Sequence, residues 1–358
     1  MSMPARPIAH RRSVAGFSLI EILIGIVIAM IGVLIMMEVL ITSERRTLTT
    51  NAGNDAMSSG AIMLHVLERD LMQAGYGINT YSLLNCNLTV AAGRVVPMAP
   101  FVINPATTLI PTGDANTDRI LVFYGNDSGE PEGNVVYTVS GTVYTLQSPS
   151  SFHVNDRVVG FDGSCAANLT LAKVTAVDTT TVTADSALAT ATALYNMGPS
   201  PTISGYRVKN GALETCDFVN SNCTSNGSQW AAVASNIVSL RAQYGVDTAA
   251  SGAMDGLVDD WNQTTPATAC GWVRRPAIRL AIVARSDQYE SKIDSVTGQR
   301  VCDTVTTTAP TWNGSASGTT PAPVVLTANT DWQCYRYQTF ENVVPARNVV
   351  WMGTQAGC

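Results

Sequence analysis

The strongest hydrophobic pattern in the sequence is an apolar run near the N-terminus, from Phe17 to Ile41. Ser18, Glu21 and Glu38 are its only strongly polar side chains. A helix rises about 1.5 Å per residue and the hydrocarbon core of a bilayer is about 30 Å thick, so this run is long enough to span a membrane. The pattern predicts a transmembrane helix over residues 17–42.

The residues ahead of the apolar run are basic. Arg6, Arg11 and Arg12 stand there without any acidic residue. Because positively charged flanks stay in the cytoplasm, we expect a single-pass membrane protein with a cytoplasmic N-terminus. Everything after Ile41 is then expected to be exported.

The position of Glu21 is unusual for a plain membrane anchor. A carboxylate inside a membrane helix costs roughly 3 kcal/mol on insertion scales, so a partner for it is expected. An ordinary secretory signal carries its small-residue cleavage site after the apolar region, whereas here Gly16 precedes it. An uncleaved signal anchor explains the apolar run but not Glu21. Cleavage after Gly16 gives Phe17 a free amine, which can pair with Glu21 of a neighbouring copy.

The hexapeptide Gly16-Phe17-Ser18-Leu19-Ile20-Glu21 resembles the class III signal peptide of type IV pilins and related pseudopilins. In that family a prepilin peptidase removes the leader and methylates the new N-terminal phenylalanine. The resemblance implies that residues 1–16 are a leader and that Phe17 is the first mature residue. It also implies that the apolar helix leaves the inner membrane for the core of a filament.

Small residues on the apolar helix suit such a filament core. Gly25, Ala29 and Gly32 recur at spacings of four and three, which lets neighbouring helices approach closely. We expect these residues and Glu21 to mediate assembly with other subunits.

A second helical pattern follows the apolar run. Apolar residues recur at spacings of three and four, which lays one apolar stripe along a helix. No proline occurs between Pro7 and Pro97, so we expect one helix from Phe17 to about Ala74, with residues 43–76 as its exported half. The predicted stripe consists of Met57, Ala61, Leu64, Leu67, Leu71 and Ala74.

Glycine marks the end and the weakest part of this helix. Gly75-Tyr76-Gly77 is a typical helix terminator. The segment from Thr49 to Gly60 contains asparagine and glycine, which are weak helix formers, so we expect any bend or frayed turn there.

Residues 77–358 show the alternation and turn signals of β-strands. Arg119–Tyr124 has the composition of a buried strand, residues 135–146 form a hairpin pattern around Ser140-Gly141, and Asn210-Gly211 is a second hairpin signal. The predicted fold class is α+β and type IV pilin-like. Its long N-terminal helix packs on an antiparallel sheet of a disulfide-containing domain that is enlarged by extra β-rich segments.

A second resemblance covers residues 236–351. Asn236–Asp247 ends in Tyr-Gly-x-Asp, an acidic loop follows, and Ala277–Arg285 leads into Arg-Ser, as in the second half of PilW-type minor pilins. The middle, from about Cys86 to Ser235, is similar only weakly. The resemblance implies a minor pilin that joins other minor pilins and the major pilin, primes assembly on the inner-membrane platform, and stays near the pilus tip.

Two other functions stay open at this point. A J-type minor pseudopilin of type II secretion shares the signal, the helix and much of the sheet. A tip adhesin or ligand-binding protein is the alternative from another class, with residues 80–235 as the binding part.

Composition and charge agree with a packed exported domain. The chain has 358 residues, of which 46% are hydrophobic and 13% charged. The formal net charge is −6, and loss of a leader with three arginines makes it more acidic. An acidic domain of this kind is a poor candidate for nucleic-acid binding, so we expect no nucleic-acid partner.

All the cysteines follow the apolar run, and their even number of 8 predicts disulfides in an oxidising compartment. Cys216 and Cys223 are the pair that we single out, because the residues between them have the asparagine and serine content of a surface loop. The sequence leaves the other pairings open.

One group of residues invites a chemical interpretation. Asp247, Asp255, Asp259 and Asp260 bring four carboxylates together on a glycine-containing stretch, and carboxylates are ligands of calcium. Their spacing does not fit an EF-hand, so a solvated acidic loop is the default and calcium the alternative. No GxSxG, HExxH or P-loop motif is present, and we expect neither an enzyme nor another cofactor.

Overall fold

The structure is a computed structural model. It describes residues 18–78, 80–125, 130, 132–188, 190–227, 229–250, 253–314, 322–326, 330–355 and 357–358. The chain divides into two compact units, Met1–Asn51 and Ala52–Cys358, and each is described by itself.

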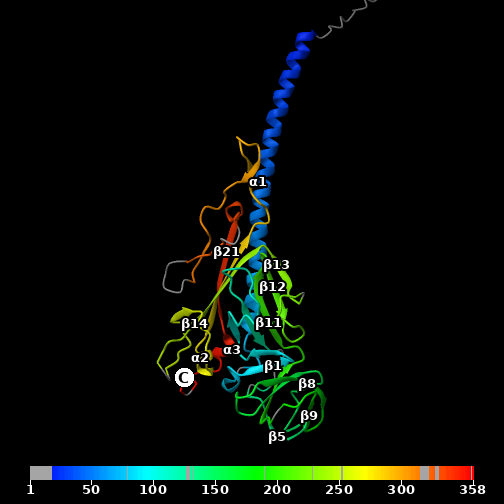
Figure 1. Cartoon of the computed structure of the whole chain (residues 1–358), viewed down its shortest axis with the longest axis vertical. Helices are drawn as coiled ribbons and strands as arrows, with labels where there is room; N and C mark the ends of the chain where they lie inside the picture. Colours follow the sequence, from blue (N-terminus) through cyan, green and yellow to red (C-terminus); the bar gives the residue numbers. More distant parts are fainter. Residues whose placement is uncertain are drawn as a thin grey trace, which may run out of the picture. The chain divides into compact units, whose positions relative to one another are not determined.

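Helix α1 extends from Leu19 to Gln73 (Figure 1). In the first unit, its stretch from Leu19 to Glu44 is long and apolar enough to cross a membrane, and none of it is buried. The segment from Thr49 to Gly60, where we expected a bend or a frayed turn, is helical throughout. Its glycines and asparagines lower helix propensity by up to about 1 kcal/mol each, but, unlike proline, they remove no backbone hydrogen bond.

The end of α1 is the one that the sequence predicts. Gly75 has a φ of +84°, which is the left-handed conformation that follows many helices. Its N–H donates to the carbonyl of Phe123 at 2.8 Å and so ties the helix end to strand β4 (Ile120–Tyr124).

The buried face of α1 differs from the predicted stripe at its start. Met57 and Ala61 are exposed, because the helix turns Gly60, rather than these two residues, toward the core. A Cβ added to Gly60 would lie 2.2 Å from Phe340 Cε2, so only glycine lets the Phe340 ring reach the helix backbone. The buried residues of α1 in the second unit, together with Ala74 directly after the helix, are Ala56, Gly60, Met63, Leu67, Asp70, Leu71 and Ala74.

One sheet that packs on this face is antiparallel, with the strand order β15-β14-β16-β21. Leu240, Tyr244 and Ile282 of this sheet belong to the same core as Leu67 and Leu71 of α1. The strands are β14 (Ile237–Val246), β15 (Asp260–Asn262), β16 (Ala277–Arg285) and β21 (Tyr337–Pro345).

A separate small core is formed by residues from β16 and from a later hairpin. Trp312 and Val324 cluster there with Ala281 and Val283 of β16. The short strands of this region are β17 (Ser291–Ile293), β18 (Arg300–Cys302), β19 (Thr311–Trp312) and β20 (Ala322–Pro323).

A second antiparallel sheet has the order β13-β12-β11-β4-β3. Its central strands contribute Leu121, Phe123 and Val208 to the core shared with α1. The remaining strands are β3 (Phe101–Ile103), β11 (Thr202–Lys209), β12 (Ala212–Asp217) and β13 (Ala231–Ser235).

The extra β-rich segment forms a closed barrel. Its strands pair in the order β5-β6-β9-β8-β7-β10, and β10 pairs with β5 to close the ring, with every neighbouring pair antiparallel. Tyr144, Val158 and Leu194 are buried in its own core. The strands are β5 (Asn134–Ser140), β6 (Val143–Leu146), β7 (Arg157–Phe161), β8 (Leu169–Val177), β9 (Thr181–Ala184) and β10 (Ala193–Gly198).

The barrel is fixed to the rest of the second unit at one wall. Strand β1 (Asn87–Ala91), which forms a hairpin with β2 (Arg94–Pro97), pairs in parallel with β8, and the Cys86–Cys165 disulfide joins the same regions. The short helices are η1 (Tyr81–Leu83), α2 (Ala269–Val273), η2 (Trp332–Cys334) and α3 (Arg347–Val350). An N-terminal apolar helix followed by a β-rich antiparallel domain confirms the predicted α+β, pilin-like fold.

The close contact at Gly60 generates a stability prediction. Replacing a helical glycine by alanine adds up to about 1 kcal/mol from helix propensity, whereas overpacking a core costs about 1–3 kcal/mol. We expect Gly60→Ala to lower the free energy of unfolding in urea denaturation, because the new methyl group collides with Phe340.

Gly53→Ala is the matched control, since a Cβ at Gly53 meets nothing within 4 Å. That variant is expected to be as stable as the wild type or more stable. Equal stabilisation by both substitutions would show that the helix does not approach Phe340 closely.

Candidate functional site

The first candidate site is the start of α1. Gly16 and Phe17, the expected processing site, lie outside the described residues. Glu21 stands in the first helical turn, and its Oε2 accepts a hydrogen bond from the Ser18 N–H at 3.5 Å. Among the residues that the structure describes, Glu21 forms no ion pair, although a helix N-terminus favours an acid by up to about 1 kcal/mol.

Small residues of α1 leave open space beside the helix. A Cβ added to Gly25 or Gly32 would meet nothing within 4 Å, and Ala29 is exposed. Because these residues are four and three positions apart, they share one face of the helix. That face has no partner within the described chain and is available to another helix, as the sequence suggests.

The second candidate site is a loop closed by a disulfide. All the cysteines are paired, and the pair singled out from the sequence, Cys216–Cys223, is one of the disulfides. The pairings that the sequence left open are Cys86–Cys165, Cys270–Cys358 and Cys302–Cys334.

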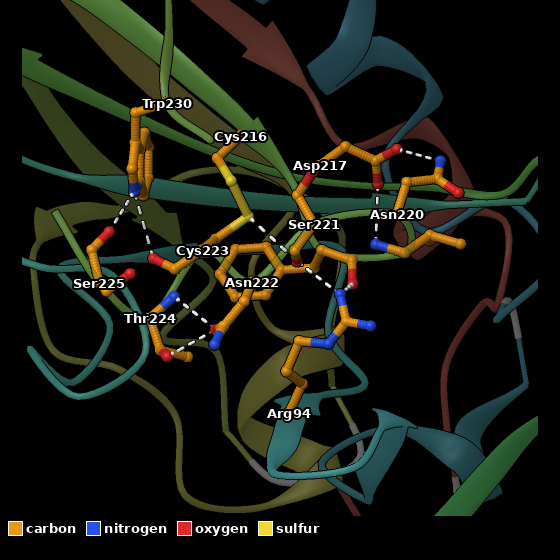
Figure 2. The surroundings of a disulfide bond; sticks show 12 residues. Arg94, Cys216, Asp217, Asn220, Ser221, Asn222, Cys223, Thr224, Ser225 and Trp230 are labelled. Atoms are coloured by element: carbon orange, nitrogen blue, oxygen red, sulfur yellow. Dashed lines mark hydrogen bonds between the residues drawn. A yellow bond between two sulfur atoms is a disulfide. The ribbon is translucent and has the colours of Figure 1, made fainter. Parts of the chain in front are cut away.

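Hydrogen bonds within the loop hold its backbone in place (Figure 2). Asp217 Oδ1 accepts from the Val219 N–H at 2.8 Å, and Asp217 Oδ2 accepts from Asn220 Nδ2 at 2.6 Å. From strand β2, Arg94 Nη1 donates to the carbonyls of Phe218 at 2.8 Å and Ser221 at 2.5 Å. The loop therefore has a fixed conformation that depends on a residue more than a hundred positions away.

The indole of Trp230 supports the other side of the loop. Its Nε1 donates to the carbonyls of Cys223 at 3.2 Å and Ser225 at 3.0 Å. The Arg207 guanidinium lies 4.1 Å from the centroid of the Trp230 ring and forms an ion pair with Glu214 at 2.8 Å. These two contacts could not be predicted from the sequence, because a single arginine and a single tryptophan that are distant in the chain form no local motif.

The four aspartates considered as calcium ligands are each engaged in separate hydrogen bonds. Within the described ranges, no group of three or more histidine, cysteine, aspartate or glutamate residues is placed to hold an ion. Each carboxylate is used locally instead. Asp259 accepts from the backbone and side chain of Thr248, Asp255 from the Leu257 N–H, and Asp260 from Asn262 Nδ2.

Asp247 is the structural centre of this acidic loop. Its side chain is 1% exposed and accepts three backbone hydrogen bonds, from Ala249 at 3.0 Å, Asp255 at 3.1 Å and Gly256 at 3.0 Å. Burial alone would raise the pKa of the Asp247 carboxyl, but the backbone donors and the charge of Arg274 at 3.7 Å outweigh it and lower the pKa. The carboxylate therefore serves as a buried cap for the loop.

A further acid, Asp70 of α1, is buried against the second sheet. It accepts hydrogen bonds from the hydroxyl groups of Tyr206 and, at 3.3 Å, Tyr124. Burial raises the pKa of the Tyr206 hydroxyl, and the Asp70 charge raises it further, so this group stays a donor. Sequence reasoning missed Asp70, because its tyrosine partners lie on strands far along the chain.

The role of Asp247 is testable by substitution. Asp247→Asn removes a charged acceptor from three buried N–H groups, and we expect it to lower the free energy of unfolding by about 2 kcal/mol at pH 7. A carboxylate with a lowered folded-state pKa stabilises above its ordinary pKa of 3.8 and loses that contribution as the pH falls through the lower value. The difference from wild type should therefore shrink below about pH 4.

Asp260→Asn is the control from the same loop, because Asp260 is exposed and, among the described residues, its carboxylate accepts a single hydrogen bond, from the Asn262 side chain. We expect it to change the unfolding free energy by less than about 0.5 kcal/mol. Equal effects of the two substitutions, or a difference that does not depend on pH, would refute the role of Asp247.

Comparisons with known protein families bear on both ends of the chain. Residues 11–37 match the prokaryotic N-terminal methylation motif, and residues 206–348 match the family described as Type IV Pilus-assembly protein W. The second match includes Cys216, Cys223 and Asp247 but not the barrel. No curated protein and no solved structure matches the chain.

The first match agrees with the apolar start of α1 and supports membrane anchoring. The two matches together support a likeness to PilW-type minor pilins, at the N-terminal segment and over residues 206–348.

Proposed function

We propose that this protein joins other minor pilins in a complex that primes assembly of a type IV pilus and remains near its tip. The observation that carries the proposal is Glu21, an acid in an exposed apolar helix with no ion pair in the described chain. An unpaired acid at membrane depth costs roughly 3 kcal/mol. The amine of Phe17 on an adjacent subunit, freed by cleavage after Gly16, offsets this cost.

The route to the filament follows from the properties of α1. The subunit waits in the inner membrane with its N-terminus in the cytoplasm and its C-terminal domain in the periplasm. Prepilin peptidase removes residues 1–16 and methylates Phe17. The assembly platform then moves the helix from lipid into the filament core, where helices of other minor pilins and the major pilin replace the lipid. A helix that is apolar all round is stable in either surrounding but not in water.

The proposed domains divide this work. Residues 17–42 form the transmembrane and filament-core helix, and residues 43–76 form its exported half. Residues 77–358 form the disulfide-containing β-rich domain.

The barrel supports a position near the tip. It adds a folded module with its own core to the sheets that carry the PilW match. A subunit that repeats along a filament needs space for such a module at every position, whereas a subunit at the tip needs it once. This argument favours a minor pilin over a major one.

The proposal is tested by deleting the gene and restoring it with variants. We expect deletion to remove surface pili and twitching, scored by electron microscopy and on agar, while type II secretion continues. The wild-type gene should restore both properties. Glu21→Ala should still be inserted and cleaved, but it should fail to co-purify with partner pilins and fail to restore pili.

Glu38→Ala is the matched control, since Glu38 is an exposed acid in the same apolar stretch but lies near its far end, where long side chains reach the interface. It should restore pili. Loss of secretion with pili intact would instead assign the chain to the J-type pseudopilins. Normal co-purification of Glu21→Ala would refute the pairing of Glu21.

A further inference from the structure

A polar cavity of about 250 Å³ lies between the barrel and the disulfide-closed loop. Its lining includes Arg157 of β7 together with Asp217 and Asn220 of the loop. Thr202 and Ser204 of β11 also line it, and Pro199 in the connection from β10 to β11 gives it an apolar edge. The assembly function proposed above does not make use of this cavity.

The acceptors and hydroxyl groups of the cavity are fixed by the fold. Ser204 and Asp217 are directly opposite each other on β11 and β12, and Thr202 lies on the same face of β11 because side chains alternate along a strand. Asn220 is held by its hydrogen bond to Asp217, as Figure 2 shows. A ligand therefore meets groups that are already in position, which reduces the entropy lost on binding.

The charge of Arg157 gives the cavity its chemical preference. Arg157 is half buried, and its guanidinium has no ion pair or side-chain hydrogen bond within the described part of the chain. A guanidinium binds a carboxylate or a phosphate through two parallel hydrogen bonds, and the Asp217 charge in the same cavity favours the carboxylate, which carries the smaller negative charge. Asp217 does not serve as that partner, because it accepts from Val219 and Asn220 and forms no ion pair with Arg157.

We propose that this cavity binds a single sugar unit that carries a carboxylate, such as a uronic acid. Arg157 binds the carboxylate, and Asp217, Asn220 and the hydroxyl groups of β11 bind the ring hydroxyls. The volume supports one sugar unit, because it is below the roughly 300–1,000 Å³ of sites for larger ligands. The Cys216–Cys223 disulfide and Arg94 act as positioning groups that hold the binding wall.

The test uses the full-length protein in detergent and saturation-transfer NMR, with empty micelles as a blank. Three probes separate the parts of the proposed ligand. Glucuronate carries the carboxylate and the ring, glucose only the ring, and acetate only the carboxylate. We expect glucuronate to bind with a Kd on the order of 1 mM, and glucose and acetate at least about tenfold more weakly.

Two substitutions assign the contacts. Arg157→Gln should weaken glucuronate binding about tenfold or more and leave glucose binding unchanged, because only the carboxylate contact is lost. Thr202→Val keeps the side-chain shape, and it should weaken the binding of glucuronate but not the binding of acetate. Arg300→Gln, the same charge change at an exposed residue of strand β18, is the control and should bind like the wild type.

Thermal unfolding of each variant verifies that the fold is retained. The proposal is overturned by the absence of saturable glucuronate binding, by equal affinity for glucuronate and acetate, or by an Arg157→Gln variant that binds like the wild type. None of these results affects the assembly function, which is tested by pilus formation.

Discussion

The packing of the second half of α1 against two sheets is the contact on which the rest of the second unit depends. Gly60 lets Phe340 of β21 reach the helix backbone, and Asp70 accepts hydrogen bonds from tyrosines of β4 and β11. The first contact is apolar and sets the rotation of the helix, whereas the second is polar and fixes the helix to a different sheet. These two contacts fix the position of the chain from Ala56 to Ala74 against the sheets.

The first half of the same helix packs against nothing within the described chain. This contrast explains how one helix can both support the β-rich domain and be available to a membrane or to other subunits. From Leu19 to Glu44 no residue is buried within the chain, so this half is soluble only in lipid or among other apolar helices. Glu21 makes a bundle of apolar helices more favourable than lipid if the bundle provides an amine to pair with it. In the proposed function, the membrane holds the subunit until assembly, and the helix then carries the folded β-rich domain into the filament.

The sequence could predict those features that arise from local patterns. The apolar run, the helix end at Gly75 and the hairpin turns follow from residues close in the chain, and so does the pairing of Cys216 with Cys223 across a short loop. The prediction of where the buried helix face starts was wrong. Met57 and Ala61 fit an apolar stripe as well as Ala56 and Met63 do, and the contact with Phe340 decides which set is buried. Barrel closure between β5 and β10 is a long-range pairing, which alternation does not specify. Asp247 as a buried cap and Asp247 as a calcium ligand also look the same in a sequence, since both need a carboxylate on a turn.

The central claim is that the N-terminal stretch is an assembly element exposed by processing, and intact-mass analysis of the protein extracted from its native membrane tests this most directly. The account predicts the mass of residues 17–358 with one added methyl group and with the hydrogens of all 8 cysteines removed by disulfide formation. Fragmentation should place the methyl group on the amine of Phe17. The unmodified mass of residues 1–358, or cleavage after the apolar run, would contradict it.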